Sequence, residues 1–386
     1  MKTIKKIMIC ILATIFVLCG CTSEFLDRNP KNAYTSSNVW QSQYLARAAA
    51  QGVYNVLYSH FSQNNTGASL GIPTDAFSSV MDIDMNWLGA AFPQNGSCTP
   101  STGGVATWYK YFYTIIYRAN DVINNISQTP DISDAEKARL IAESKFLRAY
   151  AYYNLNVLWG GVPIYTENVD ATSANKARNT VDEVWKQVLS DLNDCINEPN
   201  LPDKYASGNA NFGHITKGAA HALRGYVYQL MNDPKSALAD YEAIEQEGYA
   251  LFSPSNGAKG NNDFFMLFKP ANEQCDEVIF SVQCDRQNGM GNVRGINYGN
   301  RCTGGSAWNN YLPNPAYVEM FENADGSKFN WDDYCPGWST MQPKQRLAFF
   351  LRDGLKSGNG KWGTTDATLK SATIIQYTIK GRFMSR

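Results

Sequence analysis

Histidine and charged residues are scarce in this sequence, and their scarcity excludes several classes of site. Only three histidines occur in 386 residues, and no two of the nine cysteines are spaced as C-x-x-C. A zinc site is therefore not expected, because structural zinc sites use closely spaced Cys and His ligands. Charged residues amount to 18% of the chain, against the usual ~25%. The net charge of −1 offers no basic face for nucleic acid.

Long apolar runs are also missing, except at the N-terminus. There, three lysines within the first six residues precede an apolar run from Ile7 to Leu18. This run is shorter than the ~20 residues that a membrane-spanning helix needs. A basic start followed by a short apolar run is typical of a signal peptide, which is removed from the mature protein.

The end of this run predicts a lipid anchor. Gly20 directly precedes Cys21, and a lipoprotein signal peptidase requires a small residue at that position. We expect residues 1–20 to be the signal peptide, Cys21 to be lipidated, residues 21–34 to form a tether, and residues 35–386 to form a helical domain. A lipid chain anchors a protein to a membrane without spanning it. The alternative is an ordinary cleaved signal followed by a cysteine by chance.

The sequence does not decide whether the six cysteines after Cys21 form disulfides or remain free thiols. In an exported chain these residues could pair as disulfides, but six cysteines allow too many connectivities for the sequence to select one. They are Cys98, Cys195, Cys275, Cys284, Cys302 and Cys335.

Aromatic residues, by contrast, are abundant at 13% of the chain, and many Tyr and Trp lie in segments rich in Asn, Gly and Ser. Such segments suit neutral, hydroxylated ligands. Flat rings pack against the C–H faces of sugars, while amide, carboxylate and guanidinium groups bond the hydroxyls. An aromatic-rich core would give the same composition, so both interpretations stay open.

The first two thirds of the chain predict a succession of amphipathic helices. Apolar residues recur at helical spacing from Leu45 to Val56, from Trp108 to Ile126, from Leu140 to Leu158 and from Val184 to Ile196. Because Trp108 opens one of these stripes, it is predicted to be a core residue.

Capping signals support two of these helices. Ser133 with Glu136, and Thr180 with Glu183, have the spacing of a capping box. The segment 160–163 contains two glycines and a proline and predicts the end of the helix that begins after Ser133.

The segment from Thr216 to Glu247 predicts a helical repeat unit. Two short helices carry small residues and tyrosines at matching positions, and Asp233 caps the second helix while Pro234 opens it. A unit of ~34 residues with this pattern resembles a tetratricopeptide repeat. Further on, the alternation from Glu277 to Gln283 predicts a half-buried strand.

Three short motifs resemble catalytic or ligand-binding patterns but lack the required context. The segment from Gly67 to Gly71 matches a nucleophile elbow, yet it follows a predicted helix and not a strand. The segment from Asp82 to Asn86 resembles the opening of a calcium loop, but Trp87 stands where glycine is required. The segment from Gly289 to Gly295 misses the dinucleotide-binding spacing. We therefore predict no catalytic residue, no metal site and no cofactor.

A ligand-binding surface is the better-supported prediction. Two loops combine aromatic rings with amide, carboxylate and guanidinium groups, and we predict that they form one binding site. For each loop tryptophan, the alternative is that it fills the protein's own core. The predicted site residues are Asp82, Asp84, Asn86 and Trp87 in the first loop, and Tyr298, Arg301, Trp308 and Tyr311 in the second.

Several segments occur in the order found in a known family. A helix from Lys145 to Leu155 runs into the loop from Trp159 to Ile164, and this combination is fairly specific. With the segments from Glu24 to Asp27, from Thr216 to Ala220 and from Asp276 to Ser281, the chain resembles the SusD/RagB family. These proteins are surface lipoproteins of Bacteroidetes nutrient-uptake systems.

The resemblance implies a mostly α fold: a tetratricopeptide-like helical repeat scaffold with long irregular loops and a few short strands. It also implies a lipid-anchored outer-membrane protein facing the cell exterior. Such a protein captures oligosaccharides and delivers them to a SusC-like TonB-dependent transporter, without enzymatic activity. The resemblance supports the two loops by region, because glycan-binding members build an aromatic platform from loops between helices. A peptide-binding lid of a RagAB-like importer is the alternative, and a secreted hydrolase is a more distant one.

The chain departs from the family in length. Members usually continue well beyond this length with further helices that complete the scaffold. We therefore expect the C-terminal part of the fold to be incomplete toward Arg386, where the sequence is rich in Lys and Arg and poorly patterned.

Overall fold

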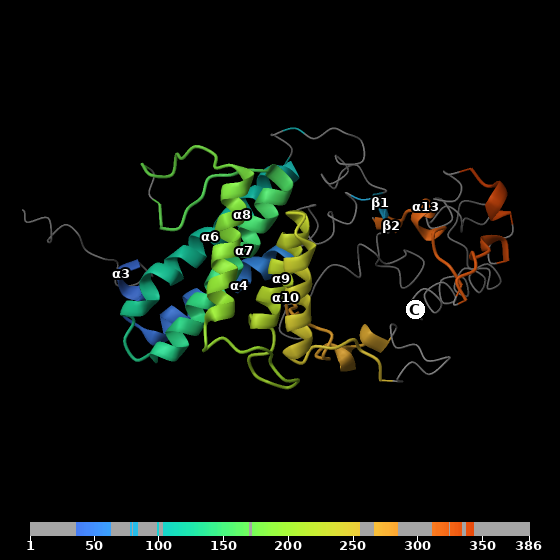
Figure 1. Cartoon of the computed structure of the whole chain (residues 1–386). Helices are drawn as coiled ribbons and strands as arrows, with labels where there is room; N and C mark the ends of the chain where they lie inside the picture. The colour runs from blue at the N-terminus through green and yellow to red at the C-terminus, as the bar shows by residue number, and fades with distance from the viewer. Residues whose placement is uncertain are drawn as a thin grey trace, which may run out of the picture.

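The computed structural model describes the chain in several segments, most of them helical. These are residues 36–62, 78, 80–83, 99, 103–169, 172–254, 266–284, 311–323, 325–333 and 337–342. The predicted lipidation site Cys21, the predicted tether and the segment from Gly67 to Gly71 lie outside them. Figure 1 shows a helical body with two short strands beside it, so the predicted mostly helical fold is confirmed. None of the helices in these segments is both long and apolar enough to cross a bilayer.

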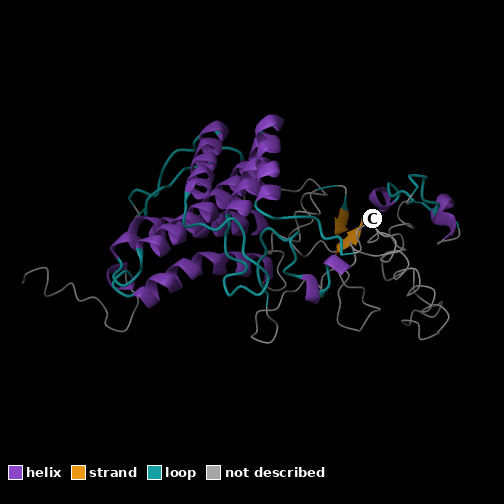
Figure 2. Ribbon diagram, turned by 60° about the horizontal axis from the view of Figure 1, so that its bottom comes forward, coloured by secondary structure: helices purple, strands orange, loops and turns teal. Residues whose placement is uncertain are grey.

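The helices form a layered stack in which neighbours along the chain pack together. Helix α7 packs between α6 and α8, α4 covers α6, and α9 packs against both α8 and α10. Figures 1 and 2 show this body from two directions. Its helices are α3 (Ser36–Val39), α4 (Gln43–Ser62), α6 (Gly103–Asn125), α7 (Asp134–Trp159), α8 (Val181–Asn197), α9 (Lys217–Leu230) and α10 (Pro234–Gln246).

The predicted apolar stripes form the core of this stack. Along α6 and into the 3-10 helix η3 (Ile126–Gln128) that follows it, residues at helical spacing from Trp108 to Ile126 are buried. Along α7 the same holds from Leu140 to Leu155. In α4, Val53 and Val56 of the predicted stripe are buried, whereas in the first half of the helix Ala46 and Ala50 are buried in place of Leu45 and Ala49. Alanines make up much of the α4 pattern, so its hydrophobic face is poorly marked in the sequence.

The helix caps are confirmed with one exception. Ser133 accepts a hydrogen bond from the Glu136 backbone N–H at 3.2 Å, but the Glu136 side chain does not return to the cap. It instead accepts two hydrogen bonds from Arg47 of α4, at 2.7 and 2.8 Å. A charged tertiary partner has therefore replaced half of the predicted capping box.

The second capping box is complete. Thr180 accepts from the Glu183 backbone N–H at 3.2 Å, and the Glu183 carboxylate accepts from the Thr180 backbone N–H at 2.7 Å. These bonds lower the pKa of Glu183 below its ordinary value, because they favour the charged form.

Helices α9 and α10 form the predicted antiparallel pair. Asp233 caps α10 by accepting from the Ser236 backbone N–H at 3.1 Å, and Pro234 occupies its first turn. The pair crosses closely at Gly225, where an added Cβ would lie 2.5 Å from the Tyr241 ring. A small residue opposite a tyrosine thus fixes the spacing of the two helices, as the tetratricopeptide-like pattern predicts.

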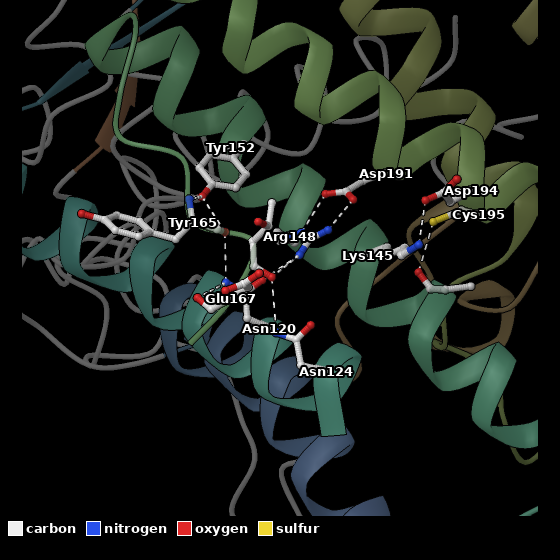
Figure 3. Close-up of polar contacts among 12 residues, drawn as sticks. Asn120, Asn124, Lys145, Arg148, Tyr152, Tyr165, Glu167, Asp191, Asp194 and Cys195 are labelled. Atoms are coloured by element: carbon white, nitrogen blue, oxygen red, sulfur yellow. Dashed lines mark hydrogen bonds and ion pairs between the residues drawn. The ribbon is translucent and has the colours of Figure 1, made fainter. Parts of the chain in front are cut away.

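A buried ion pair joins α7 to α8. It gives a structural role to Arg148, which belongs to the family-like segment from Lys145 to Leu155. Arg148 makes two hydrogen bonds to Asp191, at 2.9 and 2.6 Å, and the two side chains are only 5% and 2% exposed. Arg148 also donates to the Asn120 side-chain oxygen of α6 at 2.7 Å. Figure 3 shows how this guanidinium ties three helices together. The pair is fully hydrogen-bonded, and removing one partner would leave a buried charge unpaired.

The loop after α7 lies against α6 and α7 as an extended strap, which we define as residues 163–167. Side chains of the two helices donate to its backbone carbonyls, so the strap is hydrogen-bonded without belonging to a sheet. Tyr113 donates to the carbonyl of Pro163, and both Asn120 and Tyr152 donate to that of Tyr165. Asn124 donates to the carbonyl of Thr166, and Asn120 also donates to that of Glu167. The donor–acceptor distances are 2.8 to 3.3 Å. Figure 3 shows several of these contacts.

Two glycines allow the chain to turn into this strap. Gly160 ends α7 with a φ of 71°, a conformation that favours glycine. At Gly161 an added Cβ would lie 2.0 Å from the Asn179 backbone oxygen, so no larger residue fits where the loop passes the segment before α8. The predicted helix stop over 160–163 is thereby confirmed, with a steric reason at each glycine.

The predicted strand from Glu277 to Gln283 is wrong. This segment is irregular, with turns at its start. Its apolar residues Ile279, Phe280 and Val282 pack against the helical core, and the Phe280 ring meets Phe146 of α7 edge-on at 6.0 Å. No second strand pairs with this segment in the described part of the chain.

The described cysteines carry free thiols. Cys195 is buried in α8 and lies 3.1 Å from the Ala142 carbonyl, and burial raises its pKa well above the ordinary value. Cys275 and Cys284 are also unpaired. The other three cysteines beyond the anchor, Cys98, Cys302 and Cys335, fall outside the described segments.

Candidate ligand-binding site

The two predicted binding loops are joined by a pair of short strands. Strand β1 (Met81–Ile83) pairs antiparallel with β2 (Tyr311–Pro313), so that Asp82 lies opposite Leu312 and Ile83 lies opposite Tyr311. The Asn314 backbone N–H extends the contact by donating to the Val80 carbonyl at 3.0 Å. In Figures 1 and 2 the strands lie to one side of the helical body.

This pairing brings together residues far apart in the sequence. Asp82 and Tyr311, one predicted site residue from each loop, occupy neighbouring register positions in the two strands. Because the pair is antiparallel, the end at which the chain leaves β1 is the end at which it enters β2. The strand pair therefore places Ile83, where the chain leaves β1, opposite Tyr311, where the chain enters β2.

The remaining predicted site residues lie outside the described segments. They are Asp84, Asn86 and Trp87 of the first loop and Tyr298, Arg301 and Trp308 of the second. Their roles stay predictions, as do the side-chain roles of Asp82 and Tyr311, of which only the backbone is described. What the structure adds is the backbone connection between the two loops.

The chain after β2 forms a small aromatic cluster that the sequence did not predict. Asn314 caps the short helix α13 (Pro315–Val318) by accepting from the Ala316 backbone N–H at 2.9 Å. Beyond it, Trp331 and Trp338 stack at 4.9 Å between ring centroids, and Phe329 meets Trp331 edge-on at 5.1 Å.

These tryptophans are packing residues and not a sugar platform. Trp331 and Trp338 are 4% and 3% exposed, and the Trp338 indole donates to Glu319 at 2.8 Å. Each lies in a single-turn 3-10 helix, η5 (Trp331–Asp333) or η6 (Trp338–Thr340), so no helical or strand periodicity marked them as core. Trp108 of α6 is likewise buried, as predicted.

The structure also bears on the acidic residues of the first loop. Asp82 and Ile83 belong to β1, an extended strand and not the tight turn that opens a calcium loop. In the segments the structure describes, no group of three or more Asp, Glu, His or Cys residues is placed to hold a metal ion.

Sequence and structure comparisons agree on what this chain is similar to. Residues 24–229 match the family model of SusD-like proteins described as starch-binding and associating with the outer membrane, and this range is more than half of the chain. A SusD-like protein of Formosa agariphila is 25% identical over 284 residues, which are 70% of this chain and 51% of the relative.

Solved structures show the same fold. A SusD-like protein from Bacteroides fragilis matches with a TM-score of 0.62 and 20% identity, covering 78% of this chain and 57% of that one. Surface glycan-binding protein A from Bacteroides thetaiotaomicron, in complex with laminarihexaose, matches with a TM-score of 0.60 and 18% identity over 73% and 61% of the two chains. The chain thus spans about half to three fifths of the length of these proteins.

Proposed function

Because this chain belongs to the SusD-like family, we propose that it is a cell-surface lipoprotein that binds oligosaccharides. The observation that carries the proposal is the β1–β2 pairing, which joins the two loops rich in aromatic and hydrogen-bonding residues. The fold shared with a glycan-binding protein solved with laminarihexaose supports it.

The chemistry of the two loops fits a neutral sugar. Trp87 and Trp308 supply flat rings for the C–H face of a pyranose, and Asn86 and Arg301 supply groups that bond its hydroxyls. The small net charge of the chain offers no long-range attraction for a charged polymer. Binding then depends on stacking and on pairs of hydrogen bonds, and it breaks no bond in the ligand.

Delivery to a transporter is part of the same proposal. A lipid on Cys21 and a tether over residues 21–34 would hold the helical domain at the outer membrane beside a SusC-like TonB-dependent transporter. A tether raises the effective concentration of the bound glycan at its partner, so a modest affinity suffices. The strap and the buried Arg148–Asp191 pair hold α6, α7 and α8 together in the helical body.

A ligand screen tests the proposal directly. The chain carrying Cys21→Ser, which removes the acylation site, is applied to a glycan array and, in parallel, to an oligopeptide library. We expect binding to one group of neutral glycans and none to peptides. Binding to peptides alone would replace glycan capture with peptide capture, and release of reducing ends during long incubation would indicate a hydrolase.

Loop variants then locate the site. Trp87→Ala and Trp308→Ala are expected to abolish retention on the glycan found in the screen. The matched control is Tyr226→Ala on α9, an aromatic side chain that is 56% exposed and distant in sequence from both loops. Unchanged retention in both tryptophan variants would contradict the site assignment, whereas loss in the control variant would indicate a nonspecific effect of removing aromatics.

A further inference from the structure

A small pocket lies on the helical body, formed by the connection between α8 and α9 and by the segment 278–281. It is open to solvent and has room for about one water molecule. Aromatic rings and hydroxyl groups line it together with one imidazole. We call it the His214 pocket and define it by Tyr205, His214, Thr216, Tyr249, Phe280 and Ser281.

A buried carboxylate fixes the imidazole of this pocket. The Nδ1 atom of His214 lies 3.0 Å from Oε2 of Glu143, whose side chain is 1% exposed. Tyr54 donates to the same oxygen at 2.9 Å, and Arg139 pairs with the other carboxylate oxygen. Because an ionised carboxylate only accepts hydrogen bonds, the proton of this contact is on Nδ1.

The second ring nitrogen of His214, a residue that lines the pocket, is not used by the contact with Glu143. No described residue forms a hydrogen bond with Nε2, and the ring is 26% exposed. The ring also packs against Tyr54 at 5.1 Å between centroids, and Tyr54 accepts from the Ile215 backbone N–H at 3.1 Å. Orientation by a carboxylate on one nitrogen, with the other nitrogen unpaired, is how proteins present a histidine to a ligand.

The other walls are held in place as well. Phe280 is fixed by its edge-on contact with Phe146 of α7. The Tyr249 hydroxyl bonds Thr216 at 2.9 Å, so these two groups are already satisfied. The Tyr205 phenol keeps its proton, since burial and the Glu143 carboxylate raise its pKa. Tyr205, which lines the same pocket as His214, therefore offers a hydroxyl donor.

We infer that the His214 pocket is a second saccharide contact, which receives a single hydroxyl or hydroxymethyl group of a neutral sugar. A hydroxyl donates to Nε2 of His214 and accepts from Tyr205, and it pairs with the imidazole in either protonation state of Nε2. The nearby Glu143 carboxylate opposes an anion. The aromatic walls suit the C–H bonds beside the hydroxyl. The inference rests on the proposed glycan binding for its choice of probe but uses residues separate from the two loops.

Histidine-selective NMR tests this assignment, because the chain contains only three histidines. The Cys21→Ser chain, labelled at its imidazole nitrogens, is titrated with maltose, cellobiose and laminaribiose, and with glycerol as the polyol control. We expect at least one disaccharide to shift the His214 Nε2 signal saturably. The His221 signals serve as the internal control, since both of its nitrogens already face carboxylates, Asp240 at 2.7 Å and Glu247 at 3.6 Å.

A conservative variant completes the test. Tyr205→Phe keeps the ring and removes the hydroxyl, and it is expected to weaken the saccharide effect by about threefold to tenfold, the loss of one hydrogen bond. No shift at His214, or an equal shift with glycerol, overturns the inference and leaves a water site. If a glycan on the array binds while the His214 Nε2 signal does not shift, the inference fails and the proposed function stands. If the His214 signal shifts while no glycan on the array binds, glycan binding by the two loops is wrong.

Discussion

The helical body and the paired-strand region are built by different kinds of interaction. In the body, from α4 to α10, caps, apolar stripes and helix stops act within one helix or between neighbouring helices. In the paired-strand region, β1 depends on β2, a partner more than 200 residues away in the sequence.

Because of this difference, we expect different residues to determine the stability of the protein and its proposed ligand binding. A two-stranded ribbon alone is only marginally stable in water, so β1 and β2 add little to the free energy of unfolding. The body supplies most of that free energy through its buried core. Substitutions should therefore divide into those that unfold the body and those that only alter binding.

The largest expected effect lies in the buried ion pair. Arg148→Ala leaves Asp191 buried without its partner and is expected to cost about 3–5 kcal/mol of unfolding free energy, measured by urea denaturation. The matched control is Lys145→Ala, which removes a more exposed pair with Asp194 at 2.6 Å and should cost less than about 1 kcal/mol. Equal effects of the two variants would mean that the buried pair is not what holds α7 to α8.

A steric test of the same body follows at Gly161. Gly161→Ala places a Cβ against the Asn179 backbone oxygen and is expected to destabilise by about 1–3 kcal/mol in thermal or urea unfolding. Gly52→Ala in α4 meets only an Arg118 side-chain nitrogen at 4.0 Å, and it should stabilise by about 0.5–1 kcal/mol through helix propensity. Stabilisation by both substitutions would show that the turn after α7 does not need the close approach of Gly161 to Asn179.

The free energy of unfolding is expected to depend on pH through Glu247, the C-cap residue of α10. Burial raises the pKa of Glu247 to about 7, and Asp203 and Asp240 add to the shift while His221 and Lys217 oppose it. A carboxyl with a raised pKa binds its proton more tightly in the folded chain. Its contribution to stability is therefore present below pH ~4.5 and is lost as the pH rises through about 7.

Substitution isolates this contribution. Glu247→Gln should flatten the change in unfolding free energy between pH 5 and pH 8 by roughly 1–2 kcal/mol, measured by urea denaturation at several pH values. The control is Glu245→Gln on α10, an exposed carboxyl for which the wild-type pH profile should persist. A Glu247→Gln profile identical to wild type would contradict the account of this junction.

The smallest effect on stability is expected in the paired-strand region. Met81 lies opposite Pro313, at a Cα separation that suits a disulfide. Met81→Cys with Pro313→Cys should form a disulfide on mild oxidation, detected by peptide mapping, with little change in the helical unfolding transition. Met81→Cys with Leu312→Cys is the register control, since neighbouring strand positions point to opposite faces. Equal cross-linking of both pairs would contradict the register.

The sequence predicts the body well because its signals are local. The stripe from Trp108 to Ile126, the complete Thr180 cap and the Asp233–Pro234 start of α10 are each set by residues a few positions apart. Predictions failed where a tertiary contact intervened. Arg47 draws Glu136 away from its cap, and the apolar residues of segment 277–283 pack against the helical core without a strand partner in the described part of the chain.

The site was less predictable for a related reason. Composition indicated which loops carry aromatic and polar groups, but no local pattern indicates that Asp82 lies opposite Leu312. The His214 pocket was also not predicted. In the sequence, Glu143 resembles the other charged residues of α7, and only the fold buries it beside Tyr54 and His214. Long-range pairing and burial, and not residue type, bring together the described residues of both proposed sites.

A double-mutant cycle on glycan affinity tests the central claim most directly. Affinity for the glycan identified on the array is measured for the Cys21→Ser chain and for Trp87→Ala, Trp308→Ala and the double variant in that background. If both loops contact one ligand, each single variant loses at least about tenfold in affinity, and the double variant loses less than the product of the two, with unfolding unchanged. Full affinity in both single variants would contradict the claim that the β1–β2 pair assembles these loops into one binding site.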